Sequence, residues 1–459
     1  MADNRALRTA ADTGKPVVPV YILDHHASRA PGAARRWWLH HSLKALSLKL
    51  EGAGAGLLLR QGPTAKVVSE LLDATGADLV LWNRRYEPAA VETDRALKAW
   101  LATTETAADD FDGQLLHEPS TFKSGNGGHY KVFTPFLRAL QQRGEPRDPV
   151  AEPHKLRAFD RMPKGVALGD LKLLPLKPDW SAGLRAAWEP GESGAHAALA
   201  AFLEDVDGYA KRRDFPADAS TSRLSPHLAN GEITPHQILH ALQGARIPPL
   251  DADKFRAELA WREFAWHQLS HFPDLATKNY QPGFERLEWR PAPGALKAWQ
   301  RGETGYPIVD AGMRQLWQTG WMHNRIRMVV ASFLTKHLLI DWREGEQWFW
   351  DTLVDADPAN NPFNWQWVAG SGVDPSPYYR VFNPTLQGEK FDPEGEYVRR
   401  YVPVLAGLPA DAIHEPARDK HALEAAGLKL ARDYPVAVVE HSVARERALT
   451  AYKSMRGAS

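Results

Sequence analysis

The chain has 459 residues, 44% of them hydrophobic and 24% charged, which is enough for two or three domains with their own cores and excludes a disordered or fibrous protein. It contains no cysteine, so disulfides, thiolate metal sites and a cysteine nucleophile are excluded, and a reducing cytoplasm is the expected compartment. The 56 basic and 56 acidic side chains cancel, so a nucleic-acid site would have to be a local patch. No apolar run approaches the roughly 20 residues that cross a bilayer and the N-terminus lacks a secretory signal, so we expect a soluble, unexported protein.

The first third of the chain alternates short apolar runs with amphipathic stretches. Strands are predicted at residues 17–23, 56–59, 78–82 and 114–116, with helices between them at 37–50 and 91–101. Alternating strands and helices are typical of a doubly wound parallel sheet.

Residues 141–192 are rich in proline and glycine and show no sustained period, which indicates a long interdomain connection. From Gly194 onward, apolar residues recur at helical spacing almost to the end of the chain. The predicted architecture is therefore an α/β domain at 1–140, a linker at 141–192 and a larger all-α domain at 193–459.

The chain has 17 tryptophans, and eleven of them lie between Trp261 and Trp367. Tryptophan is costly to bury without a partner for its N–H, so the simplest interpretation of most of the eleven is a well-packed helical core. The same stretch also contains polar motifs that a core alone does not explain.

A hydroxyl-rich segment, Thr221 to Pro226, follows the basic run Lys211 to Arg213 and opens a predicted helix. Hydroxyls and backbone N–H groups at a helix start suit phosphate oxygens, but such residues are more often ordinary caps. Farther on, Arg325 and Arg327 cannot share one helical face, so one can contact a ligand while the other points elsewhere. The alternative for this pair is a solvated basic helix.

The acidic residues Asp355 and Asp357 are followed by Asn360 and Asn361. The carboxylates could accept hydrogen bonds from a ribose hydroxyl, a flavin ring N–H or nearby arginines. A divalent metal is the rival interpretation of Asp-x-Asp, and we discount it because no EF-hand-like spacing follows.

Five strings of the sequence occur in the order in which the photolyase and cryptochrome family carries them, and the chain resembles that family over nearly its whole length. The strings are Glu258–Phe264, Gly305–Asp310, Trp321–Met328, Asp341–Glu346 and Asn360–Phe391. The resemblance implies an antenna-binding α/β domain followed by a helical domain that binds FAD. Within the family, the sequence is most similar to bacterial enzymes that act on cyclobutane pyrimidine dimers.

The resemblance implies a set of residues that hold a U-shaped FAD. They are Tyr209, Thr221, Ser222, Leu224, Ser225, Arg262, Asn324, Arg327, Asp355 and Asp357. Asn361 would lie beside the flavin N5, where an asparagine suits a stable reduced flavin. Plant cryptochromes tend to carry Asp at that position, so Asn361 favours repair over signalling.

A second implied set contacts the damaged DNA. It comprises Arg213, Glu258, Trp261, Asn324, Arg325, Met328 and Trp367. Trp261 and Trp367 would stack on a flipped-out dimer, Glu258 would hydrogen-bond the thymine edge, and the two arginines would contact phosphates. On spacing alone, Glu258 forms an ordinary i,i+4 pair with Arg262, and only the resemblance favours a lesion contact.

The reaction that the resemblance implies is photochemical: excited reduced FAD gives an electron to the dimer, the ring bonds split and the electron returns. The residues that we place nearest the reaction are Glu258, Asn324, Met328 and Asn361. Trp365, Trp342 and Trp289 match the family's chain of tryptophans that carries electrons from the surface to oxidised flavin. By pattern alone, each of the three is an aromatic core residue.

Two features depart from the family pattern. The family's first strand and the Arg-Asp-Leu-Arg-like turn after it would precede Ala2, so either the start codon is misassigned or this form lacks a central strand and has a destabilised antenna domain. After Tyr86 and Glu87 the sequence reads Pro-Ala-Ala, where a polar Asn-Glu pair is expected for a folate. Methenyltetrahydrofolate remains the first choice of antenna chromophore, with a deazaflavin or none as alternatives.

The functional prediction is a dimer-specific photolyase that acts on UV-damaged DNA as a monomer, with no membrane and no obligate protein partner. The alternative is a cryptochrome-like blue-light receptor, against which the short tail after Tyr452 weighs. The branch that acts on (6-4) photoproducts generally places His where this chain has Asn324 and Met328, which disfavours that branch. A nicotinamide-dependent flavoprotein is a third hypothesis, but the α/β domain has no Gly-x-Gly-x-x-Gly after a strand.

Overall fold

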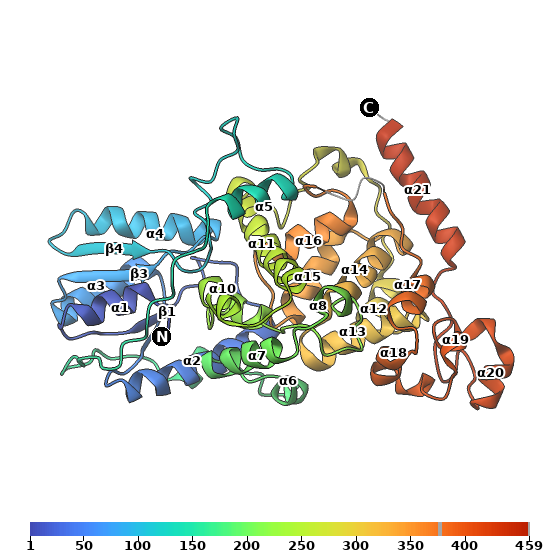
Figure 1. The fold of residues 1–459 in the computed structure, drawn as a ribbon, viewed down its shortest axis with the longest axis horizontal. Coiled ribbons are helices and arrows are strands. Elements are labelled where there is room, and N and C mark those ends of the chain that lie inside the picture. The colour runs from blue at the N-terminus through green and yellow to red at the C-terminus, as the bar shows by residue number, and fades with distance from the viewer. Residues whose placement is uncertain (375–378, 458–459) are drawn as a thin grey trace. The chain divides into compact units, whose positions relative to one another are not determined.

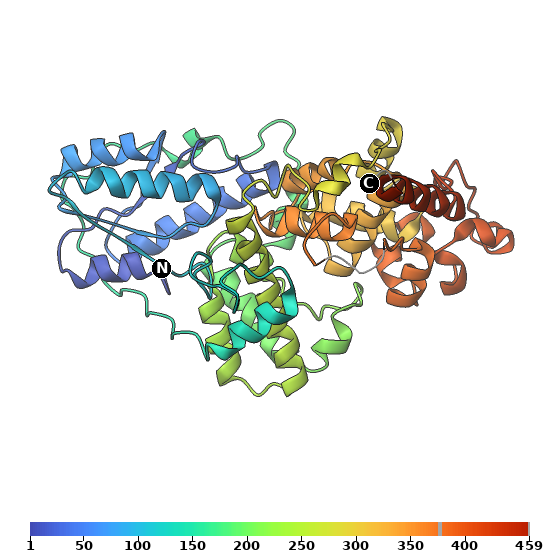
Figure 2. The same cartoon turned by 90° about the horizontal axis from the view of Figure 1, so that it is seen from above.

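A computed structural model describes residues 1–374 and 379–457, shown from two sides in Figure 1 and Figure 2. The chain divides into two compact units. Unit 1 comprises residues 1–207, 222–273 and 354–359, and unit 2 comprises residues 208–221, 274–353 and the chain from Asn360 onward. Each unit combines separate stretches of the chain. The domain boundaries predicted after residues 140 and 192 therefore stay a prediction.

Unit 1 begins with an α/β region whose strands pair in parallel. β1 (Val20–Leu23) pairs with β2 (Leu58–Gln61), and β3 (Leu79–Asn83) pairs with β4 (Ala107–Phe111). The parallel pairing and the first three strands agree with the sequence prediction. Within the described residues, however, the strands form two separate two-stranded sheets and not one doubly wound sheet.

The strand predicted at residues 114–116 is wrong, because the fourth strand lies earlier in the chain. β4 was missed because its sequence, Ala-Ala-Asp-Asp-Phe, has little apolar character. Its Asp110 is neutralised from other elements, by Arg84 Nε at 2.6 Å and Lys98 Nζ at 2.5 Å. The apolar Leu115 is buried instead in irregular chain, outside any sheet.

Helices cover the strands and form the other named elements of unit 1. Figure 1 shows α4 over β4, and α1 contacts β3. The helices are α1 (Arg5–Asp12), α2 (Ala33–Gly52), α3 (Thr64–Thr75), α4 (Pro88–Leu101), α5 (Phe133–Gln142), η1 (Leu168–Leu171), α6 (Ala182–Ala187), α7 (Glu192–Glu204), α9 (Ser225–Ala229), α10 (Pro235–Gly244) and α11 (Pro249–His271). α10 begins at a capping box, in which the side chains of Thr234 and Gln237 each accept a hydrogen bond from the other's backbone N–H.

In the described residues of unit 2 the named elements are all helices, joined by irregular chain. Its helices are α8 (Tyr209–Arg212), η2 (Pro282–Arg286), α12 (Pro293–Arg301), α13 (Pro307–Thr319), α14 (Asn324–Ser332), η3 (Phe333–His337), α15 (Trp342–Thr352), α16 (Asn360–Ala369), α17 (Pro384–Phe391), α18 (Glu396–Tyr401), η4 (Pro403–Leu405), α19 (Ala410–Ile413), η5 (Pro416–Arg418), α20 (Lys420–Ala425) and α21 (His441–Gly457). Trp299, Phe333, Trp342 and Tyr397 are completely buried in its core. This agrees with the predicted helical, tryptophan-rich core.

The close contact of α13 and α14 gives a stability prediction. A Cβ added at Gly312 of α13 would overlap Ile326 Cγ2 of α14, and overpacking a core typically costs about 1–3 kcal/mol, so Gly312→Ala should lower the free energy of unfolding by about that amount. Gly294→Ala in α12 is the control, because a Cβ there meets nothing within 4 Å. Urea unfolding followed by tryptophan fluorescence measures both, and an unchanged midpoint for Gly312→Ala would contradict the close contact.

Candidate functional site

The acidic pair predicted to contact the flavin lies in a short buried loop of unit 1, residues 354–359. Asp355 and Asp357 are 8% and 7% exposed. Ser225 Oγ, at the start of α9, donates a hydrogen bond of 2.7 Å to Asp355 Oδ2. The structure therefore brings together two of the predicted FAD residues that are 130 positions apart in the sequence.

A half-buried arginine that the sequence did not reveal supports this loop. Arg35 of α2 donates from Nη1 to Ala356 O at 2.9 Å and from Nη2 to Ala229 O, at the end of α9, at 3.2 Å. Burial lowers the pKa of Arg35, and the nearby Asp357 carboxylate opposes that lowering. Arg35 thus holds the acidic loop and α9 together, although in the sequence nothing distinguishes it from its exposed neighbour.

The hydroxyl-rich segment bends sharply just before α9. Arg223 has a left-handed backbone with φ of 52°, and its guanidinium lies 4.1 Å from the centre of the Trp188 ring. Within the described residues, the buried hydroxyl of Ser220 has no hydrogen-bond partner. A buried polar group without a partner costs roughly 1–3 kcal/mol, so a ligand oxygen or N–H would suit this position.

The predicted FAD residues are divided between the two units. Ser222, Leu224, Ser225, Arg262, Asp355 and Asp357 belong to unit 1, and Tyr209, Thr221, Asn324, Arg327 and Asn361 belong to unit 2. Tyr209 is 5% exposed, and the guanidinium of Arg213 lies 5.7 Å from the centre of its ring. A predicted FAD residue and a predicted DNA residue are therefore neighbours in unit 2.

Glu258 and Arg262 of α11 both have partners in unit 1. Glu258 forms an ion pair of 3.3 Å with Lys254. Arg262 Nη1 donates to Gln114 O at 3.0 Å and lies 3.2 Å from Glu263 Oε1. Each therefore has an ion-pair partner other than the one that helical spacing predicted.

Trp261 of α11 stacks face to face on Phe133, the first residue of α5. The ring centres are 3.5 Å apart and the planes differ by 7°. Phe264 meets both rings edge-on. The half-buried indole is therefore held at a fixed angle, and a fixed aromatic face is what stacking on a base requires.

The two arginines of α14 have different partners, as the spacing predicted. Arg325 Nη2 lies 2.9 Å from Asp214 Oδ2, and its guanidinium lies 4.3 Å from the centre of the Phe391 ring. Arg327 Nε donates to Met322 O at 2.7 Å. Neither arginine is simply solvated, so the alternative of an exposed basic helix does not hold.

α14 begins at Asn324 behind a histidine cap. His323 Nδ1 accepts a hydrogen bond of 3.2 Å from Arg325 N. Burial lowers the pKa of His323 to about 4, so the imidazole is neutral at pH 7 and can act as an acceptor. Met328, one turn farther, places its sulfur 3.9 Å from Arg325 Nη1. The implied lesion contacts Asn324, Arg325 and Met328 thus lie within the first turns of one helix.

The amide of Asn361, in α16, is oriented by Glu346 of α15. Asn361 Nδ2 donates to Glu346 Oε1 at 2.8 Å and to Glu346 O at 3.0 Å, and both residues are buried. Because these bonds use the N–H side of the amide, Oδ1 remains as its acceptor side.

The three tryptophans predicted to carry electrons lie at different depths of unit 2. Trp342 and Trp365 are 0% and 2% exposed, whereas Trp289 is half-buried against Leu287 and Met455. An order from buried to partly exposed fits a path between the interior and the surface. The path itself stays a prediction.

The surroundings of the two inner tryptophans are closely packed. Trp342 Nε1 donates to Asn279 Oδ1 at 2.9 Å, and the ring of Trp365 meets Phe349 edge-on with centres 5.0 Å apart. Gly345 of α15 allows this approach, because a Cβ there would overlap the Trp365 ring. Farther along α16, Trp367 Nε1 donates to Asp374 O at 2.9 Å.

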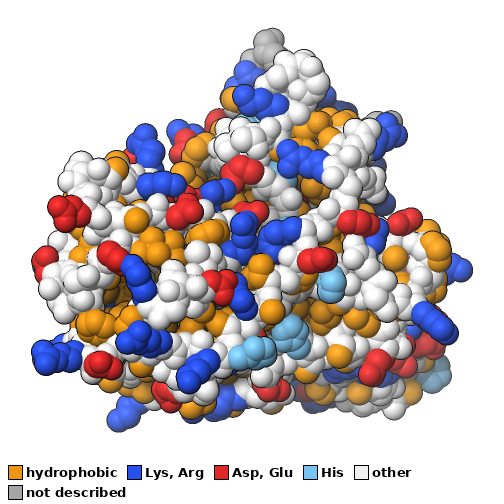
Figure 3. All heavy atoms as spheres, turned by 60° about the vertical axis from the view of Figure 1, so that its left-hand side comes forward, with side chains coloured by type: hydrophobic (Ala, Val, Ile, Leu, Met, Phe, Trp, Pro, Cys, Tyr) orange, Lys and Arg blue, Asp and Glu red, His pale blue; other side chains and the backbone are white. Residues whose placement is uncertain are grey.

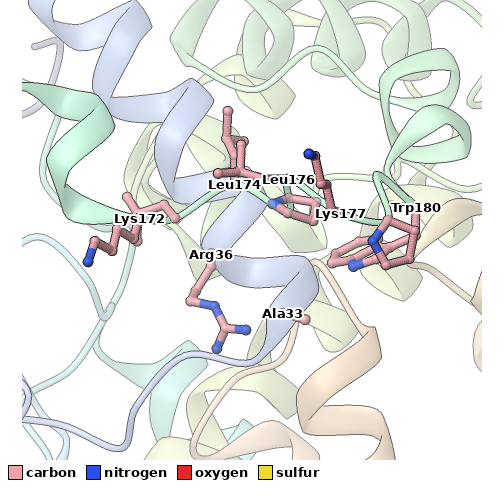
Figure 4. Close-up of a pocket in the computed structure, with 10 residues that line it drawn as sticks. Ala33, Arg36, Lys172, Leu174, Leu176, Lys177 and Trp180 are labelled. Atoms are coloured by element: carbon pink, nitrogen blue, oxygen red, sulfur yellow. The ribbon is translucent and has the colours of Figure 1, made fainter.

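A pocket of about 250 Å³ lies in unit 1 between α2 and the chain at residues 172–180. Trp180 and a run of leucine and proline residues form its walls. Figure 4 shows that the charged ends of Arg36, Lys172 and Lys177 point in different directions, so the cations form a rim and do not converge on one point.

A metal-binding cluster and a membrane-spanning helix are both absent from the described residues 1–374 and 379–457. No group of three or more His, Cys, Asp and Glu side chains there is arranged to hold a metal ion. No helix in that part of the chain combines the length and the apolar character that crossing a membrane requires.

Two family models match the chain, one described as DNA photolyase over residues 1–154 and one as the FAD binding domain of DNA photolyase over residues 255–454. The deoxyribodipyrimidine photo-lyase of Agrobacterium fabrum is 53% identical over 99% of this chain and 96% of its own length. The crystal structure of a bacterial class III photolyase from Agrobacterium tumefaciens matches with a TM-score of 0.97 at 53% identity, covering 99% of this chain and 95% of that one. A cryptochrome from Synechocystis matches with a TM-score of 0.88 at 27% identity, covering 98% and 96%. The chain therefore belongs to the DNA photolyase and cryptochrome family.

Proposed function

We propose that the protein is a light-driven deoxyribodipyrimidine photo-lyase that splits cyclobutane pyrimidine dimers in DNA. The observation that carries the proposal is the amide of Asn361, whose N–H side is engaged by Glu346 so that its oxygen is the acceptor. N5 of a flavin carries a hydrogen when the flavin is reduced, so a fixed acceptor beside it favours the reduced form. Relatives named deoxyribodipyrimidine photo-lyase, at 53% and 37% identity over 99% of the chain, support the same function.

FAD fits the polar groups that the described residues offer. When bound and reduced, FAD supplies the photochemistry, in which light transfers an electron to the dimer and back. Asp355 and Asp357 would accept hydrogen bonds from the donors of the cofactor, and Arg35 would balance their charge. The buried hydroxyl of Ser220 would gain a partner. The side chains thus bind and orient, and none has to act as a nucleophile.

The lesion contacts would hold the dimer outside the duplex. Flipping a nucleotide costs a few kcal/mol, and stacking of roughly 1–3 kcal/mol per base can offset that cost. Trp261, fixed by Phe133, and Trp367, fixed by its bond to Asp374 O, would provide the stacking faces. Glu258 would hydrogen-bond the thymine edge.

The two arginines proposed to contact phosphates, Arg325 and Arg213, make different contacts in the structure. Arg325 is 20% exposed and already paired with Asp214, so a phosphate would have to share or replace that carboxylate. Arg213 lies over the ring of Tyr209, which is compatible with a second phosphate contact. We therefore assign orientation of the strand to Arg325, with a smaller share of the total affinity.

We also propose methenyltetrahydrofolate as the antenna chromophore, with a deazaflavin or none as alternatives. Glu87, near the expected folate contacts, accepts a hydrogen bond of 2.7 Å from Arg29 N, and burial raises its pKa. The pocket beside Trp180 offers an aromatic wall for a flat chromophore (Figure 4).

The two parallel strand pairs support the proposal that β1 to β4 belong to one doubly wound layer. We further propose a cytoplasmic monomer without an obligate protein partner.

Repair of UV-irradiated oligo-dT is the direct test. We expect the reduced, FAD-loaded protein to lower the dimer content over repeated turnovers under blue light and to leave it unchanged in the dark. Chromatography of the digested oligonucleotide measures the dimers. A dimer content that does not fall under blue light, with reduced flavin bound, would defeat the proposal.

Replacing Arg35 tests the support of the acidic loop. Removing one partner of a buried charge costs roughly 3–5 kcal/mol, so Arg35→Met should retain FAD far less well than the natural protein during dialysis. The ratio of flavin to protein absorbance measures retention. Arg36→Met is the matched control, because Arg36 is the exposed neighbour on the same helix. Equal retention in Arg35→Met and the natural protein would separate Arg35 from the flavin site.

Trp342→Phe tests the electron path. Phenylalanine is much harder to oxidise than tryptophan, so photoreduction of oxidised flavin should slow several-fold, while repair by chemically reduced protein should stay the same. Trp350→Phe is the control, since Trp350 is another buried tryptophan of α15. Flavin absorption under blue light with an external reductant follows the rate. Equal photoreduction rates in Trp342→Phe and the natural protein would remove Trp342 from the path.

A further inference from the structure

One basic segment of unit 1, residues 119–144, is used by neither the flavin contacts nor the lesion contacts. The sequence contains no Asp or Glu between Glu118 and Glu145. The segment's basic residues are Lys123, Lys131, Arg138 and Arg143. Over the whole chain the 56 basic and 56 acidic residues balance, and Figure 3 shows the two signs interspersed over one face of the molecule.

The charges of the basic segment are available at the surface. All four cationic side chains are exposed, and among the residues that the structure describes none of them forms an ion pair. Burial, together with His271 and Lys131 nearby, lowers the pKa of His129, so at pH 7 the positive charge comes from the lysines and arginines.

The first part of the basic segment is a glycine-rich loop that projects before α5 (Figure 1). A hollow of about 650 Å³ lies against this loop, and its lining residues run from Ser124 to Pro135. Glycines at 125, 127 and 128 carry no side chain, so an extended ligand can approach the backbone closely.

The loop is fixed to the helix that carries the proposed lesion contacts. Tyr130 N donates to His267 Nε2 at 3.1 Å, and Gln268 Nε2 donates to Tyr130 O at 2.8 Å. Three residues farther on, Phe133 stacks on Trp261. Tyr130 and Phe133 both contact α11. Lys131, which lies between them in the chain, therefore has a defined position relative to Trp261.

We infer that the basic segment binds the sugar-phosphate backbone of DNA beside the lesion, through Lys123 and Lys131. This inference rests on the proposed function. Exposed cations that form no ion pair among the described residues, together with an open glycine backbone, suit a run of phosphates, which are read by charge and not by sequence. Phe133 joins the basic segment to Trp261. A DNA strand whose dimer stacks on Trp261 would therefore pass close to the loop.

The test compares Lys123→Gln/Lys131→Gln with the natural protein, both loaded with FAD. Dissociation constants are measured for one duplex, UV-irradiated and undamaged, at several salt concentrations. Each phosphate contact contributes about 0.9 to the magnitude of the slope of log K against log salt. The double variant should therefore show a slope smaller in magnitude by about 2. Its affinity at 0.1 M salt should be lower by on the order of 10- to 50-fold. Both duplexes should lose the same factor, and repair per bound lesion should not change.

Lys66→Gln/Lys155→Gln is the matched control, because it removes two exposed lysines of the same unit and should bind as the natural protein does. If the double variant does not fold, Lys131→Gln alone should lower the slope by about 1. An unchanged slope and affinity, or a loss confined to damaged DNA, would overturn the inference while repair by the natural protein leaves the proposed function standing. Failure of the natural protein to repair dimers would defeat the proposed function instead.

Discussion

The position of the site-bearing helix α11 depends on one buried carboxylate, Glu263. The side chain is 0% exposed, its Oε2 accepts from His117 Nδ1 and Leu116 N at 2.8 Å each, and its Oε1 lies 3.2 Å from Arg262. A buried charge without partners costs several kcal/mol, so Glu263 is tolerated only while these partners are in place. The carboxylate therefore fixes residues 116–117 against α11. It also orients Arg262, a predicted FAD contact, from the position next to it.

A similar arrangement supports two other parts of the candidate site, the Asp355 loop and Asn361. Arg35 holds the loop of Asp355 through backbone carbonyls, and Glu346 fixes the amide of Asn361. A charge-assisted bond in a buried setting is stronger and more directional than one at the surface. Rigid placement of the flavin and lesion contacts thus comes from residues that need not touch either ligand.

The sequence predicted what depends on local pattern and failed where stability comes from distant partners. The helices predicted at 37–50 and 91–101 lie within α2 and α4. β4 was misplaced because its acidic residues are neutralised by Arg84 and Lys98 from elsewhere in the chain. Arg35 could not be found for the same reason, since only the fold brings it beneath the acidic loop. The assignments of individual residues to flavin and lesion came from family resemblance and stay predictions.

A net charge of zero is compatible with DNA binding when the contacts are divided by task. Exposed charges act over a Debye length of about 10 Å at 0.1 M salt, so the balanced surface as a whole attracts DNA weakly and only local groups matter. Arg325, already paired with Asp214, gains little from a phosphate, whereas Lys123 and Lys131 have no such competitor among the described residues. Backbone affinity would then come from the loop and selectivity from the face of Trp261. That division suits an enzyme that must release undamaged DNA quickly, because non-specific binding stays modest while a flipped dimer adds stacking that intact bases do not offer.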